Sequence, residues 1–426
     1  MFKKNKVAIK ALRMMNKTSK NIYLTGEAGT GKSTLLRDFI SKTTKNTAIL
    51  APTGLSAINV GGETIHSFCK FSLDPGFKII QDNKIHRLKS RKKLKALDTI
   101  IIDEISMVRA DTLDAMNIFF QINIGNKKPF GGLQLILIGD HFQLPPILRA
   151  DQKTEYSKLY YCEYFFAAKV FFDLKLNFFK LTQIYRQEDS QYIKLLSYLR
   201  YGIQNPSLIK WINTNLVNKP IKNKSLPVTI ATRNLDVTKF NHTKLESLSG
   251  EVRSYKAIIE GDFKKETFPT DKYLVLKEKA QIMFIKNDLE RNWVNGTIGK
   301  IDSLYKDYIV VKLPNGKKIK ITEEAWEINK YEFNEKNQKL EKVVIGSFTQ
   351  FPIKLAWAVT IHKSQGQTFD SCIIDMGVGS FVFGQTYVAF SRCTSLEGLS
   401  LRKPIKVSDI KTDPHIIDFE KKTKWN

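Results

Sequence analysis

Gly26-Glu27-Ala28-Gly29-Thr30-Gly31-Lys32-Ser33-Thr34 is the stretch of this sequence that decides its fold. It matches G-x-x-x-x-G-K-[ST], and it lies between a predicted strand and a predicted helix, which is the context that this phosphate-binding motif needs. The glycines let backbone N–H groups turn toward phosphate oxygens, and the start of the helix favours an anion. The stretch therefore predicts a nucleoside triphosphate site formed by Gly26, Ala28, Gly29, Thr30, Gly31, Lys32, Ser33 and Thr34.

Charged and hydroxyl side chains complete the predicted chemistry of this site. Lys32 is placed to neutralise the β and γ phosphates, and Ser33 to offer its hydroxyl to Mg²⁺. The apolar run 100–102 ends in Asp103 and Glu104. We expect Asp103 to hold Mg²⁺ and Glu104 to orient or deprotonate the attacking water. Acidic residues after strands are also common loop formers, so this assignment depends on the phosphate loop.

A third predicted strand, 135–138, is followed by Gly139-Asp140-His141-Phe142-Gln143-Leu144-Pro145-Pro146. An amide at Gln143 can hydrogen-bond the γ-phosphate or the water and so report whether triphosphate or product is bound. A motor needs such a sensor, whereas a kinase does not. Taken alone, Gln143 only suggests this role.

Short apolar runs organise the first third of the chain, and they lie at 22–24, 48–50, 100–102 and 135–138. Such runs are typical of strands buried on both faces of a parallel sheet. Helical patterns separate them, which predicts doubly wound α/β architecture. The alternation restarts after about residue 180, with a predicted strand at 228–231.

Two segments interrupt the alternation. Residues 69–96 include a stretch rich in Lys and Arg at 84–95, which predicts an exposed helix between two strands. Residues 271–345 contain short predicted strands at 298–301, 308–311 and 318–321. Asn315-Gly316 predicts a tight hairpin turn, because both residues tolerate positive φ. We interpret this segment as a small β-barrel inserted into a second α/β domain.

Composition limits the classes of protein that the chain can be. Its 426 residues suggest two to four domains, and 68 Lys and Arg against 42 Asp and Glu give a net charge of +26. Such a charge favours polyanionic partners, although a lysine-rich composition alone could produce it. No apolar run suits a membrane span or a signal peptide. The four cysteines form no C-x-x-C pair, so we expect neither disulfides nor a zinc site in this protein, and a reducing cytoplasm as its compartment. They are Cys69, Cys162, Cys372 and Cys393.

Assembled in order, these motifs resemble the petite-integration-frequency (Pif) family of superfamily I B-type DNA helicases. The resemblance runs from about Asn21 to Leu401. It includes Ala51-Pro52-Thr53-Gly54, Thr64-Ile65-His66-Ser67, Asp103-Glu104-Ile105-Ser106-Met107, Pro129-Phe130-Gly131-Gly132, Leu181-Thr182-Gln183-Ile184-Tyr185-Arg186-Gln187, Thr360-Ile361-His362-Lys363-Ser364-Gln365-Gly366-Gln367-Thr368 and Tyr387-Val388-Ala389-Phe390-Ser391-Arg392-Cys393-Thr394.

The resemblance implies two RecA-like parallel-sheet domains with two insertions. The first RecA-like domain would comprise 1–68 and 97–180, and the second 181–270 and 346–426. The basic segment 69–96 would be a wedge that parts the duplex, and 271–345 an SH3-like β-barrel. Because ATP in this family lies between the two domains, two arginines of the second would reach the γ-phosphate. The implied catalytic set is Lys32, Asp103, Glu104, Gln143, Arg186 and Arg392, with Gly366 as a further nucleotide contact.

The implied DNA contacts are Thr53, Gly54, His66, Asn295, Thr360, His362 and Lys363. Hydroxyl, imidazole and ammonium groups suit phosphates, and histidine also stacks on bases. Two alternatives stay open, namely a structural salt bridge for either arginine and a buried structural role for His362. The aromatic-rich stretch 160–179 looks like a base-stacking platform, but its spacing favours core packing. The adenine-reading glutamine of the family is missing before the loop, since no Gln precedes Gln81, and Asn5 is the candidate substitute.

The resemblance implies an enzyme that hydrolyses ATP with Mg²⁺ and moves 5′ to 3′ on single-stranded DNA. It would unwind duplexes at single-strand/duplex junctions, with G-quadruplexes and RNA–DNA hybrids as further substrates. The family acts in DNA replication, repair, recombination and telomere maintenance. An RNA helicase and the motor module of a relaxase or recombination complex are the alternatives. We expect a cytoplasmic, nucleoid-associated prokaryotic or viral protein without membrane contact, monomeric or dimerising on DNA.

Overall fold

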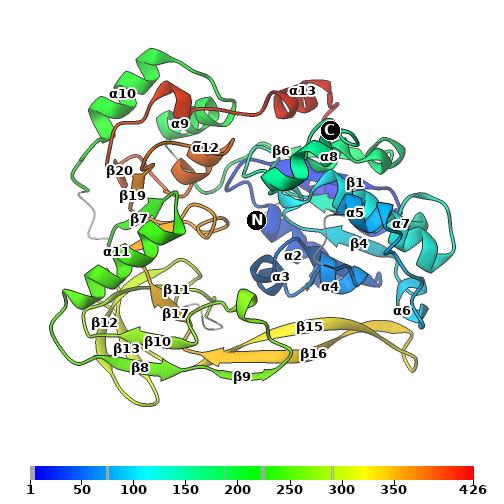
Figure 1. The fold of residues 1–426 in the computed structure, drawn as a ribbon. Helices are drawn as coiled ribbons and strands as arrows, with labels where there is room; N and C mark the ends of the chain where they lie inside the picture. The colour runs from blue at the N-terminus through cyan, green and yellow to red at the C-terminus, as the bar shows by residue number, and fades with distance from the viewer. Residues whose placement is uncertain (1–4, 73–75, 188, 222–225, 289, 291) are drawn as a thin grey trace. The chain divides into compact units, whose positions relative to one another are not determined.

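The computed structural model describes residues 5–72, 76–187, 189–221, 226–288, 290 and 292–426. The chain divides into two compact units (Figure 1). Unit 1 comprises Met1–Arg186, Ile328–Ile345 and Asp413–Asn426, and unit 2 comprises Gln187–Glu327 and Gly346–Thr412. Segments 328–345 and 413–426 thus belong to unit 1, although the sequence predicted the first in the barrel and the second in the second α/β domain.

Unit 1 is built on a six-stranded sheet of order β3-β2-β4-β5-β1-β6, in which neighbouring strands are parallel. The strands are β1 (Ile22–Gly26), β2 (Thr47–Ala51), β3 (Glu63–Thr64), β4 (Thr99–Ile102), β5 (Gln134–Ile138) and β6 (Asn177–Leu181). The four strands predicted in the first third of the chain are confirmed. Because they are parallel, their carboxyl ends share one edge of the sheet.

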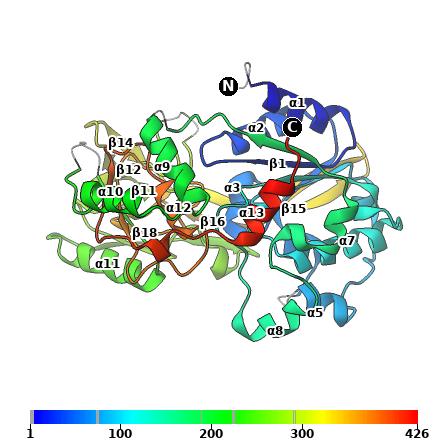
Figure 2. The same cartoon turned by 90° about the horizontal axis from the view of Figure 1, so that it is seen from above.

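Helices cover both faces of this sheet. Ile22, Leu24 and Ile101 belong to a core shared with α1 (Lys6–Lys17) and α2 (Lys32–Lys42). The alternate residues Tyr23 and Ile100 are also buried. Figure 2 shows α1 and α2 on one side of β1 and α7 (Ala110–Ile124) on the other. The shorter helices of unit 1 are α3 (Gly54–Val60), α4 (Ile65–Cys69), α5 (Gly76–Gln81), α6 (Lys92–Lys95), α8 (Lys153–Ser157) and α13 (Pro414–Lys422).

The exposed basic helix predicted within 84–95 is wrong. Only Lys92–Lys95 is helical there, while Lys84–Arg91 lacks regular structure and 73–75 lies outside the described residues. Local tertiary contacts explain the difference. Leu94 is buried, and Lys93 extends over the Phe68 ring, with its Nζ 3.9 Å from the ring centroid. The segment is therefore held against unit 1 by a few anchoring side chains rather than by a continuous helical face.

Unit 2 contains a second parallel sheet of order β18-β7-β19-β20. Its strands are β7 (Val228–Ala231), β18 (Ala358–Thr360), β19 (Cys372–Asp375) and β20 (Leu399–Leu401), and its helices are α9 (Ser190–Arg200), α10 (Pro206–Leu216), α11 (Asn234–Glu246) and α12 (Gln385–Phe390). The predicted strand at 228–231 is confirmed. Two parallel sheets in two units confirm the predicted α/β architecture.

The predicted β-rich insertion is also present in unit 2. Five antiparallel strands have the order β14-β13-β12-β11-β17, and they are β11 (Gln281–Phe284), β12 (Ile298–Leu304), β13 (Ile309–Lys312), β14 (Lys318–Ile321) and β17 (Ile353–Leu355). The predicted turn at Asn315-Gly316 joins β13 to β14. A two-stranded sheet of β8 (Arg253–Lys256) and β10 (Tyr273–Leu276) adds to the same core. The β-rich region therefore begins before residue 271 and ends after 345.

A long hairpin connects the β-rich region to unit 1. It consists of β15 (Glu324–Asn334) and β16 (Lys339–Gln350), and β9 (Ile258–Gly261) pairs with the base of β16. The distal part, Ile328–Ile345, belongs to unit 1. There the Tyr331 hydroxyl accepts a hydrogen bond from Ile49 N at 3.0 Å, and Tyr331 N donates to Glu63 at 3.3 Å. These contacts explain why the hairpin tip departs from the predicted barrel.

Helix α13 returns the end of the chain to unit 1. Its Phe419 ring stacks on Phe166, with centroids 4.4 Å apart and planes 6° apart. Five of the nine aromatic residues in the stretch 160–179 are buried, as predicted, including Tyr164, Phe165 and Phe179, and Phe171 and Phe178 are half-buried. Tyr161 and Phe172 are exceptions, because they are 58% and 72% exposed.

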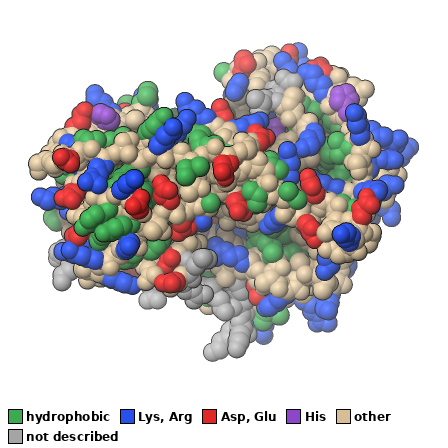
Figure 3. Space-filling model, turned by 90° about the horizontal axis from the view of Figure 1, so that it is seen from below, with side chains coloured by type: hydrophobic (Ala, Val, Ile, Leu, Met, Phe, Trp, Pro, Cys, Tyr) green, Lys and Arg blue, Asp and Glu red, His purple; other side chains and the backbone are tan. Residues whose placement is uncertain are grey.

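On the face that Figure 3 shows, the positive charge does not gather in one dominant patch. Lys and Arg side chains are spread over that face, and Asp and Glu side chains lie between them. No helix among the described residues combines the length and apolar character needed to cross a membrane.

Candidate active site

The phosphate loop leads from β1 directly into α2. Gly31 precedes the first helical residue with φ +86°, a left-handed conformation that favours glycine. The Thr30 hydroxyl donates to the Glu27 carbonyl at 2.8 Å and closes the loop. Lys32 Nζ donates to the carbonyls of Gly26 at 2.7 Å and Glu27 at 3.1 Å. The structure therefore places the ammonium group over a preformed loop at the start of a helix, where anions are favoured.

Asp103 and Glu104 follow β4 at the same edge of the sheet. Asp103 is 8% exposed. Burial, followed by the neighbouring Glu104 carboxylate, raises the pKa of Asp103 to about 7, although Lys32 oppositely favours its charged form. Glu104 has φ 52° and ψ 45°, a conformation that non-glycine residues rarely adopt and that is frequent at functional sites. The geometry thus confines two carboxylates close to Lys32.

These residues fit a magnesium ion bound together with phosphates. Mg²⁺ usually takes one or two protein oxygens and completes its octahedral shell from phosphates and water. Ser33 offers a hydroxyl on the first turn of α2, and Asp103 offers a buried carboxylate that a cation would stabilise. In the described part of the chain, no group of three His, Cys, Asp or Glu gathers that could hold a metal ion. The donor set therefore fits a cation that arrives with the nucleotide.

Gln143 lies on a tight turn after β5. Its backbone N–H donates to the Asp140 carbonyl at 2.9 Å, and its side-chain amide donates to Asp140 Oδ2 at 3.4 Å. The turn begins at Gly139, where a Cβ would lie only 2.9 Å from Ile105 Cγ2. Since Ile105 follows Glu104, this close approach brings the turn of Gln143 against the carboxylate segment.

The segment after β6 also contacts the phosphate loop. Tyr185 N donates to the Gly29 carbonyl at 2.9 Å. Arg186 follows it and is half-buried, and it ends the first segment of unit 1 rather than belonging to the second α/β unit. The loop, the carboxylates, Gln143 and Arg186 therefore all follow the carboxyl ends of strands in one sheet.

Two predicted DNA contacts of unit 1 line one groove of about 350 Å³. Thr53 begins α3, where its hydroxyl accepts a hydrogen bond from Ser56 N, and Gly54 follows it. His66 lies on α4 across the groove. Burial, followed by the charge of Arg109, lowers the pKa of His66, which favours a neutral ring near neutral pH. Such a ring can accept a hydrogen bond or stack on a base.

The predicted DNA contacts of unit 2 cluster on the turn after β18. Gln367 Nε2 lies 3.5 Å from Asn295 Oδ1, so the two motifs are neighbours. Lys363 is exposed, and burial lowers the pKa of His362. Thr360 differs, because it is 2% exposed and its hydroxyl accepts from Lys363 N at 3.3 Å. Its position suits the stabilisation of the turn better than direct contact with a strand.

Comparison with known proteins places this arrangement in a family. The family model for PIF1-like helicases matches residues 2–207. An ATP-dependent DNA helicase Pif1 from Bdellovibrio bacteriovorus is 31% identical over 95% of this chain and 89% of that protein. The chain belongs to the PIF1-like helicase family.

Solved structures agree with this assignment. Bacteroides sp Pif1 in complex with ADP-AlF4 has a TM-score of 0.88 and 34% identity, covering 98% of this chain and 96% of that one. Bacteroides Pif1 bound to ssDNA has a TM-score of 0.70 and 35% identity with the same coverage. The predicted family and fold class, two RecA-like domains with a β-rich insertion, are therefore confirmed. The chain spans 62% of the length of the Xenopus laevis relative, an ATP-dependent DNA helicase PIF1.

In this PIF1-like helicase, Arg392 is buried within unit 2 and 1% exposed. Its guanidinium donates to the carbonyls of Val388 at 3.0 Å, Ser364 at 3.3 Å and Gln367 at 3.2 Å. Arg392 therefore organises the turn that contains Gly366, which is exposed. To bind the γ-phosphate as predicted, the guanidinium would have to replace some of these hydrogen bonds to carbonyls with bonds to phosphate oxygens.

Two residues of the groove were missed from the sequence. Arg109 and Arg149 line the groove of Thr53 and His66, and Arg109 Nε donates to Asp111 at 2.8 Å. The position of Arg109, two residues after Asp103-Glu104-Ile105-Ser106-Met107, could have suggested it. Arg149 lies in a loop after the Pro145-Pro146 pair, where nothing in the sequence indicates the groove. Asn5 Oδ1 accepts from Ala8 N at 3.0 Å and caps α1, so its oxygen already has a structural partner.

Proposed function

We propose that this PIF1-like helicase is an ATP-dependent DNA helicase that translocates 5′ to 3′ on single-stranded DNA and unwinds duplex DNA. One observation carries the proposal. Lys32, the Asp103–Glu104 pair and Gln143 follow three strands whose carboxyl ends share one edge of the unit 1 sheet. Ligands bind at such edges of open α/β sheets. A preformed anion-binding loop beside two carboxylates is what triphosphate hydrolysis needs.

The proposed chemistry assigns one task to each side chain. Lys32 binds the β and γ phosphates, and Glu104 orients the attacking water or accepts its proton. Bound Mg²⁺, held by Ser33 and Asp103, would neutralise charge on the phosphates. Gln143 reports the state of the γ-phosphate through the turn that it shares with Asp140. Arg186 and Arg392 supply positive charge to the transition state.

The proposed DNA contacts use side chains of both units. In unit 1, Thr53, Gly54 and His66 lie at or beside the groove that also contains Arg109 and Arg149. In unit 2, the turn with Lys363, His362 and Asn295 offers an ammonium group, an imidazole and an amide. Such groups bind phosphates and bases. The ssDNA-bound Bacteroides relative and the net charge of +26 support single-stranded DNA as the track.

The polarity, the substrates beyond duplex DNA and the setting rest on family membership. G-quadruplexes and RNA–DNA hybrids belong to the proposal as further substrates. So do action at single-strand/duplex junctions, a monomer that dimerises on DNA, and a cytoplasmic, nucleoid-associated protein of replication, repair or recombination.

Strand displacement on tailed duplexes tests the proposal. Substrates with a 5′ tail, a 3′ tail or no tail would be incubated with the full chain, ATP and Mg²⁺. We expect displacement only with the 5′ tail, because a 5′-to-3′ motor loads there and moves toward the junction. ATP hydrolysis is measured in parallel with single-stranded DNA and RNA of the same sequence. Displacement from the 3′ tail would contradict the polarity, and stimulation by RNA alone would favour an RNA helicase.

A further inference from the structure

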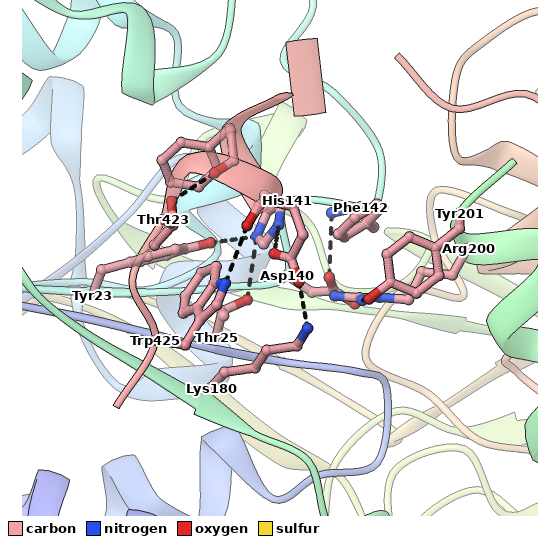
Figure 4. Close-up of polar contacts among 12 residues, drawn as sticks. Tyr23, Thr25, Asp140, His141, Phe142, Lys180, Arg200, Tyr201, Thr423 and Trp425 are labelled. Atoms are coloured by element: carbon pink, nitrogen blue, oxygen red, sulfur yellow. Dashed lines mark hydrogen bonds and ion pairs between the residues drawn. The ribbon is translucent and has the colours of Figure 1, made fainter. Parts of the chain in front are cut away.

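The turn that carries Gln143 has a second anchor, which is formed around His141. His141 lies between Asp140 and Gln143 and is completely buried. Its Nδ1 lies 2.8 Å from the hydroxyl of Tyr23 and 3.4 Å from that of Thr25. Tyr23 and Thr25 belong to β1, the strand that leads into the phosphate loop. Figure 4 shows the His141 ring enclosed by these side chains.

The other ring nitrogen of His141 is held by the end of the chain. Glu420, on α13, places Oε2 3.0 Å from His141 Nε2. Its second oxygen forms an ion pair with Lys180 of β6. Trp425 stacks on the imidazole, with ring centroids 6.0 Å apart and planes 7° apart (Figure 4). Residues from β1, β6 and α13 thus surround one side chain of the turn after β5.

The hydrogen-bond partners determine which ring nitrogen of His141 carries a proton. An ionised carboxylate only accepts, so Nε2 of His141 carries the proton that points at Glu420. The Tyr23 hydroxyl can then donate to Nδ1 or accept from it, and both ring nitrogens have partners in either case. Because both nitrogens of the His141 ring are hydrogen-bonded, the ring cannot move freely, and this restrains the backbone of the turn. That backbone positions Asp140, whose carboxylate accepts from Phe142 N at 3.2 Å and from the Gln143 amide at 3.4 Å.

We propose that Glu420 is a positioning residue for ATP hydrolysis, which holds His141 so that the turn of Gln143 keeps its place beside the catalytic carboxylates. The inference deepens the proposed function and rests on it. Glu420 does not touch the nucleotide; it acts through His141 and Asp140. Hydrolysis by the first α/β domain therefore depends on a helix that lies more than 270 residues later in the chain.

The competing explanation is that Glu420 only stabilises the docking of α13. A matched variant separates the two roles. Asp413 caps the same helix by accepting from His415 N at 2.9 Å, and its other oxygen accepts from the Tyr164 hydroxyl at 3.2 Å. Asp413→Ala therefore weakens the docking of α13 and leaves the side-chain partners of His141 in place. Glu420→Gln is the conservative variant, because its amide oxygen can still accept from Nε2 while the ion pair with Lys180 is lost.

The test measures kcat and KM for ATP with the full chain and saturating single-stranded DNA, at a temperature where thermal unfolding shows every variant folded. We expect Glu420→Ala to lower kcat about 10- to 100-fold, as for other residues that orient a functional group, with KM within about twofold of the parent. Asp413→Ala should keep the parent kcat, and Glu420→Gln should recover most of it.

Equal losses of kcat in Glu420→Ala and Asp413→Ala would overturn the positioning role, and so would an unchanged kcat in Glu420→Ala. If Glu420→Ala does not fold, Glu420→Gln decides: a kcat as low as that of Gln143→Ala would overturn a positioning role through the hydrogen bond to His141, because the amide oxygen can still accept from Nε2. The parent chain and Lys32→Ala are measured alongside. A parent without DNA-stimulated hydrolysis would contradict the proposed function itself, whereas a stimulated parent with unaffected Glu420 variants contradicts only this inference.

Discussion

At the residue scale, Lys32 provides the sharpest test of the nucleotide site. Its ammonium group lies over the loop carbonyls, where it would meet phosphate oxygens. We expect Lys32→Ala to lower DNA-stimulated ATP hydrolysis by about 10²–10³-fold, because one preorganised charge at the transition state is lost. Lys42→Ala is the control, since Lys42 lies at the other end of α2 and pairs only with Asp38 among the contacts of the described residues. Equal activity in the two variants would contradict the phosphate-loop assignment.

Arg392 tests whether a buried arginine serves hydrolysis. Lysine in its place keeps the charge but cannot satisfy three carbonyls with the same planar geometry. If Arg392 supplies charge to the γ-phosphate, Arg392→Lys should lower kcat by up to about 10³-fold with little change in ATP affinity. Fluorescent-nucleotide binding and ATP turnover measure the two effects. A variant that loses folding stability but keeps the parent kcat would identify Arg392 as purely structural.

Glu420 also predicts a pH dependence of stability. Burial would raise its pKa, but hydrogen bonds and charge from His141 and Lys180 outweigh burial and lower it from 4.5 to about 2. A lowered folded-state pKa stabilises the fold above about pH 4.5, and this stabilisation is lost as the pH falls toward 2. Denaturant unfolding between pH 6 and 2.5 should therefore show a shallower acid loss in Glu420→Gln than in the parent. Asp418→Asn, exposed on the same helix, should retain the parent slope.

Much of this site can be predicted from the sequence, because its residues directly follow apolar strands. The loop, Asp103, Glu104 and Gln143 follow β1, β4 and β5, and a parallel sheet necessarily brings those positions to one edge. The Glu420–His141 contact could not be predicted in this way. It joins a strand end to a terminal helix, and no local pattern records which helix packs beneath the turn.

At the element scale, the β15–β16 hairpin supplies a hydrogen bond that the unit 1 sheet lacks. β3 pairs with β2 only at Leu50 and Ala51, so the N–H of Ile49 has no strand partner on that side. The Tyr331 hydroxyl accepts from it in a buried setting. Tyr331→Phe should destabilise the fold by about 1–3 kcal/mol, the cost of a buried donor without an acceptor. Chemical denaturation measures this loss, and Tyr273→Phe, 55% exposed on β10, should be nearly neutral.

Elements with strong periodicity were predictable, whereas those defined by tertiary contact were not. Strands β1, β2, β4 and β5 each contain a run of three or more apolar residues, and the β13–β14 hairpin has its Asn-Gly turn. The helix predicted within the basic segment 84–95 was wrong, because the prediction rested on clustered lysines, which are typical of a solvent-exposed helix. In the structure, Lys93 instead packs on Phe68, and a turn of four residues suffices.

At the scale of the whole molecule, compact units do not follow sequence order. Segments 328–345 and 413–426 join unit 1 after excursions through unit 2. The sequence predicted that 271–345 is one inserted barrel and that 346–426 belongs wholly to the second domain, since an inserted domain is simplest when its ends return to the same place. The hairpin tip and α13 are each held by a few side chains, among them Tyr331 and Phe419, and no change of composition marks these residues.

The excess of positive charge predicts a strong salt dependence of DNA binding. Each phosphate neutralised on a single strand contributes about −0.7 to the slope of log K against log salt. If about five phosphates are contacted, affinity for single-stranded DNA should fall about 100-fold between 50 and 200 mM salt. Fluorescence anisotropy with a labelled oligonucleotide measures the slope. Lys363→Ala, on the exposed turn after β18, should make it shallower by about 0.7, while Lys256→Ala, exposed on β8, should leave it unchanged. An unchanged slope in Lys363→Ala would remove that residue from the proposed DNA contacts, because a diffuse field of this size does not depend on one lysine.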